Sequence, residues 1–155
     1  RAGAPPAAPP SPAPNVRVIA DTNTAVSASL WGGLPAEILA AARARRISLH
    51  TSPALLAELE DAPAREKFVA PIAQVGSSTV QMIAGYRALA TPVRPAVIEP
   101  TVRDPDDDHV LACALGAQAA LIVTRDRDLL ELGAFRDIRI LAAREALALI
   151  GSGTR

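Results

Sequence analysis

Short apolar runs alternate with helical patterns from residue 16 onward, and this alternation constrains the fold more than any other feature. Residues 16–20 (VRVIA) and 120–124 (ALIVT) are rich in β-branched residues, as expected of strands that are buried on both faces. Residues 47–50 and 138–141 are two further predicted strands. Because helical patterns separate these runs, the sequence predicts the α/β class with a mainly parallel sheet.

The predicted helices fill the intervals between the strands. Ser52 and Pro53 are typical of an N-cap and a first helical residue, and Asp104 and Pro105 form a similar pair. The expected helices cover residues 35–46, 53–59, 64–69, 78–90, 104–116, 126–132 and 143–150. Residues 91–100 contain three prolines and are predicted to be mostly loop, with a short strand at 96–99.

The two ends of the chain are expected to lie outside the folded domain, which we place at residues 16–150. Residues 1–15 contain six prolines and are predicted to be a disordered, extended tail, and residues 151–155 to be a flexible C-terminus. One cysteine excludes a disulfide scaffold and fits a reducing cytosol, so we expect a cytoplasmic protein. No apolar run approaches the length that spans a bilayer.

Sixteen basic and sixteen acidic residues cancel, so any binding to a polyanion must depend on local features. The carboxylates are unevenly placed. Asp21 directly follows the strand 16–20, and Asp126 follows the strand 120–124 by two residues. Because the carboxyl ends of parallel strands line the ligand crevice of an open sheet, these two acids are expected to share one edge.

Four carboxylates fall within the five residues 104–108 (DPDDD), at a predicted helix start. Acids in a first turn are often no more than favourable partners of the helix dipole. Four of them, however, crowd like charges together and raise pKa values unless a cation is near. Helical spacing places Asp107 and Asp108 on the face that carries Leu111, toward the sheet, and turns Asp106 more toward solvent.

Glu58 also flanks the apolar face of its predicted helix. A carboxylate beside an apolar face needs a partner, and arginine or a cation would serve. A set of Asp and Glu without paired histidines or cysteines favours a hard cation such as Mg²⁺ or Mn²⁺. The chemistry that follows from such a set is metal-assisted attack of water on a phosphodiester.

Four segments, in this order, resemble the PIN-domain nucleases: VIADTN (18–23), SPALLAELE (52–60), RDPDDDHVLACAL (103–115) and LIVTRDRDLL (121–130). The nearest resemblance is to the toxin components of toxin–antitoxin pairs, and it covers about residues 16–150. It implies a three-layer α/β sandwich with a central parallel sheet, and an acidic pocket that binds Mg²⁺ or Mn²⁺. It also implies cleavage of RNA, silencing by a cognate antitoxin protein and pairing as a homodimer.

The resemblance also assigns roles to residues. Asp21 corresponds to the first metal ligand, with Asn23 or Thr22 as its orienting partner, and Glu58 to the second acid. The third acid is Asp107 or Asp108, and the fourth is Asp126, with Asp128 nearby. The remaining predicted contacts, which orient these acids or bind substrate, are made by Thr124, Arg125 and Asp104.

One departure from the family pattern lies at Arg125, where this branch usually has glycine; arginine there would narrow the pocket or reach toward phosphate. Two other functional classes compete with a nuclease. A phosphotransfer domain would need a lysine at a strand end, and Lys67 lies in a predicted helix. A non-catalytic PIN-like module that binds RNA or protein would not need the complete acidic set.

Overall fold

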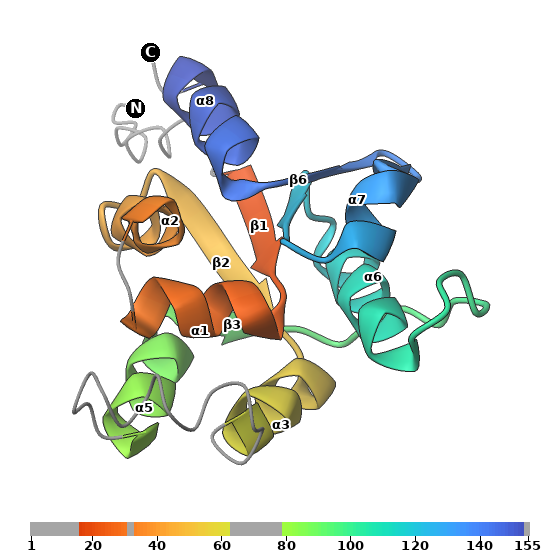
Figure 1. Cartoon of the computed structure of the whole chain (residues 1–155), viewed down its shortest axis with the longest axis horizontal. Helices are drawn as coiled ribbons and strands as arrows, with labels where there is room; N and C mark the ends of the chain where they lie inside the picture. The colour runs from red at the N-terminus through yellow and green to blue at the C-terminus, as the bar shows by residue number, and fades with distance from the viewer. Residues whose placement is uncertain (1–15, 31–32, 63–78, 154–155) are drawn as a thin grey trace, which may run out of the picture.

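The computed structural model describes residues 16–30, 33–62 and 79–153, which form one six-stranded sheet with helices on both faces (Figure 1). The strand order is β3-β2-β1-β4-β6-β5, and all neighbours are parallel except the β5–β6 pair. The strands are β1 (Val16–Ala20), β2 (Ile47–Thr51), β3 (Ala90–Pro92), β4 (Leu121–Val123), β5 (Ala134–Phe135) and β6 (Ile138–Leu141). The predicted α/β sandwich with a mainly parallel sheet is confirmed.

Two helical layers bury opposite faces of this sheet. The described helices are α1 (Thr22–Leu30), α2 (Gly33–Arg43), α3 (Pro53–Asp61), α5 (Thr79–Leu89), α6 (Pro105–Ala117), α7 (Arg127–Leu132) and α8 (Ala143–Gly153). Val18 and Leu121 pack with α1, α2, α5 and α8, whereas Ile19 and Ile122 pack with α6 and α7. This alternation follows from the two-residue period of a strand. Helix α3 contributes to both layers.

The side of the sheet on which the chain adds its next strand changes between β1 and β4. From β1 the chain builds outward through β2 to β3, and then crosses over to place β4 on the other side of β1. In open α/β sheets, ligands bind outside the carboxyl ends of the strands at such a switch point. Asp21 follows β1 and Asp126 follows β4, so both acids lie at this switch point.

Several element boundaries differ from those that the sequence predicts. Helix α1 was not predicted, and the short edge strand lies at Ala90–Pro92 rather than at 96–99. Helix α2 ends at Arg43, before Arg45 adopts a φ of 62°. Helix α8 continues to Gly153. The predicted tail at 1–15 and the predicted helix at 64–69 lie outside the described residues.

Residues 93–102 form an extended segment that crosses α6. The Ala96 amide donates to the carbonyl of Ala112 at 2.9 Å. Gly116 permits this close approach, because a Cβ at that position would lie 2.2 Å from the Arg94 carbonyl oxygen and 3.0 Å from the Pro95 Cα. The close packing of this segment on α6 therefore requires a residue without a side chain at position 116.

Among the described helices, none is by itself both long and apolar enough to cross a membrane. Helices α1 and α2 meet that criterion only as a pair joined by a sharp bend. Many of their apolar side chains are buried in the core, among them Val26, Ile38 and Leu39.

Candidate functional site

A pocket of about 140 Å³ lies at the carboxyl ends of β1 and β4, and carboxylates dominate its walls. Of the described residues that line it, none is basic. Six are acidic and come from four parts of the chain: Asp21, Glu58, Asp104, Asp106, Asp107 and Asp126. Thr22, Asn23 and Val110 complete the lining of this acidic pocket.

Asp21 is fixed by the start of α1 and by the end of β4. Its Oδ1 accepts a hydrogen bond from the Thr24 amide at 2.9 Å, and its Oδ2 accepts one from the Thr124 hydroxyl. Only 6% of Asp21 is exposed. Burial raises the pKa of this carboxyl above its ordinary value, and the charge of Asp126 adds to the rise, whereas the hydrogen bonds from Thr124 and Thr24 oppose it.

Thr124 links the acid after β1 to the acid after β4. Its fully buried hydroxyl donates to Asp21 and accepts from the Asp126 amide at 2.9 Å. Asp126 is in turn the N-cap of α7, because its Oδ1 accepts from the Leu129 amide at 3.1 Å. Ordinary helix capping thus holds both carboxylates at the sheet edge.

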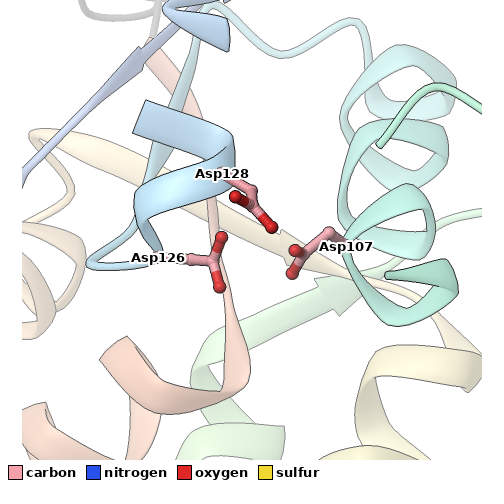
Figure 2. A group of neighbouring side chains, drawn as sticks. All are labelled: Asp107, Asp126 and Asp128. Carbon is pink, nitrogen blue, oxygen red and sulfur yellow. The ribbon is translucent and has the colours of Figure 1, made fainter. Parts of the chain in front are cut away.

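Asp107 projects from the first turn of α6 toward α7. Oxygen atoms of Asp107, Asp126 and Asp128 all lie within 4.8 Å of one another (Figure 2). Asp107 is 8% exposed, and its Oδ2 is buried without a hydrogen-bond partner among the described residues. Desolvation, together with the neighbouring charges of Asp126, Asp104 and Asp21, raises the pKa of Asp107 to about 7.

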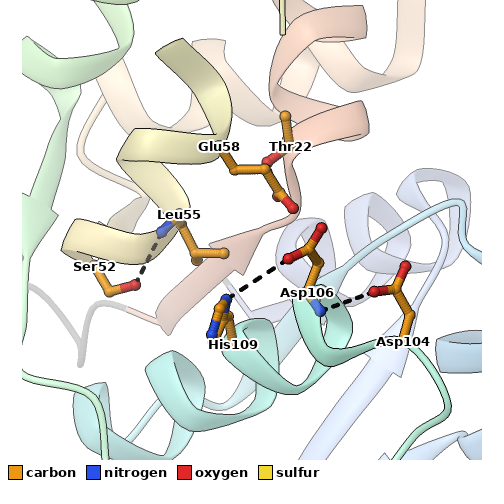
Figure 3. A network of polar contacts seen from close by, with 7 residues as sticks. All are labelled: Thr22, Ser52, Leu55, Glu58, Asp104, Asp106 and His109. Atoms are coloured by element: carbon orange, nitrogen blue, oxygen red, sulfur yellow. Dashed lines mark hydrogen bonds and ion pairs between the residues drawn. The ribbon is translucent and has the colours of Figure 1, made fainter. Parts of the chain in front are cut away.

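Across the acidic pocket, Thr22 at the start of α1 and Glu58 of α3 face Asp104 and Asp106 at the start of α6 (Figure 3). Glu58 of α3 accepts a hydrogen bond from the Thr22 hydroxyl of α1. Asp104 is the N-cap of α6 and accepts from the Asp106 amide at 2.9 Å. Asp106 Oδ1 lies 3.9 Å from Nδ1 of His109, one helical turn further along.

Asp108 does not line the acidic pocket, which corrects the predicted orientation of this residue. Its Oδ1 accepts from the amides of Thr101 at 3.1 Å and Val102 at 2.9 Å. These amides belong to the segment that precedes α6. Because the Asp108 carboxylate binds them, it points away from the acidic pocket. The structure places Asp107 in the pocket in its stead, together with Asp106, which was expected to face solvent.

Two other predicted contacts are arranged differently from the expectation. The hydrogen bonds to Asp21 come from Thr24 and Thr124, whereas Asn23 lines the pocket with its Oδ1 buried and unpartnered among the described residues. The Arg125 guanidinium donates to the Ser27 hydroxyl of α1 at 3.3 Å and is not part of the pocket lining. In this conformation Arg125 does not narrow the pocket.

Sequence reasoning did not select Asp106, and it noted Asp128 only as a neighbour of Asp126. Side chains of a helix tilt toward its N-terminus, so first-turn residues project beyond the helix end. This tilt brings Asp106 into the pocket although helical spacing turns it away from the buried face. The signal for Asp128 was its position two residues after Asp126, in the first turn of α7.

The donor set fits a hard divalent cation. It consists of carboxylate oxygens, as Mg²⁺ and Mn²⁺ prefer, and it includes the unpartnered Oδ2 of Asp107. Asp21, Asp107 and Asp126 form no ion pair with any arginine or lysine in the part of the chain that the structure describes. The repulsion among these three carboxylates is therefore not compensated by any basic side chain that the structure describes, and a bound cation would compensate it.

Comparisons with known proteins agree with this geometry. The family model described as PIN domain matches residues 17–128, which include every carboxylate of the acidic pocket. Searches of curated proteins and of solved structures gave no significant match. PIN domains are generally nucleases and usually use divalent metals. With the matching residues, the mainly parallel sheet and the acids at its switch point, the chain belongs to the PIN-domain family.

Proposed function

We propose that the protein is an endoribonuclease that hydrolyses RNA phosphodiesters with Mg²⁺ or Mn²⁺, and that it is the toxin component of a toxin–antitoxin pair. The convergence of carboxylates from separate elements on one pocket at the switch point of the sheet carries this proposal. Membership of the PIN-domain family supports it, because such domains are generally nucleases.

Asp21, Asp107 and Asp126 are the residues that would hold the cation, with Glu58 and Asp128 at its margins. A divalent cation supplies positive charge that makes water more acidic and stabilises the negative charge that develops on the phosphate. The protein's own part is to keep these oxygens in place. It does so through the amide of Thr24, the hydroxyl of Thr124 and the amide of Leu129.

Thr124 is a positioning residue in this proposal, because it touches two of the acids and has no exposed surface. Thr124→Val removes the hydroxyl with little change in volume, and Thr124→Ser retains it. We expect the valine variant to need a higher Mn²⁺ concentration for half-maximal cleavage, and the serine variant to restore the original value. An equal shift in both variants would contradict a role for the hydroxyl.

The proposed partners follow from the same role. The protein would act in the cytoplasm as a homodimer, cut RNA and be silenced by a cognate antitoxin protein. A small DNA-binding protein encoded directly upstream would identify this antitoxin, and its co-expression would relieve growth arrest caused by the nuclease. If expression of the active nuclease leaves growth unchanged, the toxin role is wrong.

Cleavage of single-stranded RNA in Mn²⁺, in Mg²⁺ and in chelator tests the biochemical proposal. We expect cleavage that depends on the metal, and a loss of about 100-fold or more in Asp21→Asn, since loss of a cation contact removes several kcal/mol of charge stabilisation. Asp137→Asn, an exposed position outside the pocket, is the matched control. Unchanged cleavage in Asp21→Asn with an intact fold would overturn the proposal.

A further inference from the structure

A second and larger pocket lies beside the acidic pocket. Its volume is about 350 Å³, and most of its lining surface is apolar. Three structural parts form it: the start of α3, the segment that crosses α6, and the first two turns of α6. The residues that matter most here are Ala54 of α3, Val97 and Ile98 of the crossing segment, and Asp108 and His109 of α6.

Helices α3 and α6 contribute residues to both pockets. In α3, Glu58 lines the acidic pocket and Ala54, one turn earlier, lines the apolar pocket. In α6, Asp106 lines the acidic pocket and His109, one turn later, lines the apolar pocket. Figure 3 shows Asp106 and His109 facing α3 across this junction. One helical turn is about 5.4 Å, so a ligand that enters both pockets needs reactive and apolar parts about that far apart.

The walls of the apolar pocket favour a neutral, flat group. Val97 is almost fully exposed, at 98%, and the His109 side chain is about half exposed, so both present surface to a ligand. The Asp108 carboxylate is held by the amides of Thr101 and Val102, and its charge opposes entry of a phosphate. Unpaired bases of RNA stack on aromatic rings, histidine included, and donate hydrogen bonds from their edges to acceptors such as carboxylates.

We propose that the apolar pocket is a nucleobase subsite, which receives the base of the nucleotide next to the phosphate held in the acidic pocket. This inference rests on the proposed ribonuclease function and names its substrate as single-stranded RNA, because only an unpaired base can enter such a pocket. His109 forms the stacking surface, and Asp108 accepts a hydrogen bond from the base. The residues of this pocket then set which base is preferred at the cleavage site.

The direct test follows backbone amide shifts while the four nucleoside 5′-monophosphates are added in turn with Mg²⁺. At least one nucleotide is expected to shift the amides of residues 96–99 and 108–112, which border the apolar pocket. Ala54→Phe fills the pocket from α3 and should abolish those shifts. Ala57→Phe places the same side chain on the exposed side of α3 and should preserve them.

RNA cleavage gives the second readout. Ala54→Phe and His109→Ala are each expected to raise KM about tenfold, the size of one lost base stack, and to weaken the base preference. Ala57→Phe should match the original protein. His109→Ala keeps the test decisive if Ala54→Phe does not fold.

The two proposals fail in different ways. Metal-dependent cleavage with unchanged KM and base preference in Ala54→Phe and His109→Ala would overturn the subsite and leave the nuclease intact. Absence of amide shifts at residues 96–99 and 108–112 with all four nucleotides would also overturn it. Absence of cleavage in the original protein would overturn the nuclease, and the amide shifts would still decide the nucleobase subsite.

Discussion

The acidic pocket and the apolar pocket lie one turn apart on the same two helices and are built from opposite kinds of side chain. In the acidic pocket, burial and like charge raise the pKa values of Asp21 and Asp107. These carboxylates therefore destabilise the folded state unless they bind a cation or are protonated. Among the described residues that line the apolar pocket, one is a carboxylate, Asp108, and backbone amides hold it. This difference in charge means that the acidic pocket is suited to a cation and the apolar pocket to a neutral ligand.

The largest expected effect is stabilisation by a cation. Mn²⁺ at about 100 times its dissociation constant should add about 2.7 kcal/mol to the free energy of unfolding, because it binds only the folded state. For a chain of this size that corresponds to a Tm rise of about 5–10 °C in a thermal scan. Asp126→Asn should remove most of the rise, and Asp137→Asn should keep it. An equal rise in both variants would place the cation elsewhere.

Gly116→Ala disturbs the apolar pocket alone and comes next in size. The new Cβ would collide with the backbone of Arg94 and Pro95, so we expect a loss of about 1–3 kcal/mol in urea unfolding. Gly85→Ala is the control, because a Cβ there meets no atom within 4 Å and alanine favours a helix by up to about 1 kcal/mol. The Mn²⁺ stabilisation should be the same in both variants, and its loss in Gly116→Ala would show that the pockets are not independent.

The pH dependence of stability tests the acidic pocket separately from the apolar pocket. Between the ordinary pKa of 3.8 and the pKa of about 7 for Asp107, the folded protein holds a proton that the unfolded chain has released. The free energy of unfolding in chelator should therefore fall as pH rises through this range.

Asp107→Asn tests this directly, since it removes the titrating group. In chelator its Tm should exceed that of the original protein at pH 8, and the two should converge near pH 4. A lower Tm for Asp107→Asn at pH 8 would show that its charge is compensated in the fold.

The smallest expected effect is at Arg125, which contacts Ser27 outside both pockets. Arg125→Gly introduces the residue that is usual in the branch this chain resembles, and it should change the free energy of unfolding by about 0.5 kcal/mol or less. If the guanidinium leaves Ser27 for a substrate phosphate, KM for RNA should rise while the Mn²⁺ stabilisation stays constant. An unchanged KM would show that Arg125 takes no part in binding RNA and only contacts α1.

Strands β1, β2, β4 and β6 were predictable because they are short apolar runs, and Asp21 and Asp126 were predictable as pocket residues because they follow two such runs. Helix α1 was not predicted, since Thr22, Asn23 and Thr24 are weak helix formers and its sequence has no apolar stripe. The Asp21 carboxylate caps this helix, and packing of Val26 against the core sustains it.

The choice among the four acids of residues 104–108 could not be made from helical spacing. It depends on where the preceding segment lies, because the amides of Thr101 and Val102 take Asp108 out of the acidic pocket. The edge strand was misplaced for a related reason. The three prolines of residues 91–100 favoured a loop there, but an edge position tolerates proline, so β3 forms at Ala90–Pro92 beside β2.

The central claim is that carboxylates distant in sequence bind one divalent cation at the switch point of the sheet. Anomalous X-ray scattering from a crystal soaked in Mn²⁺ tests it most directly. We predict an anomalous peak between Asp21, Asp107 and Asp126, within about 2.5 Å of a carboxylate oxygen from at least two of them. A peak only at other residues, or no peak with these three acids paired to arginines, would contradict it.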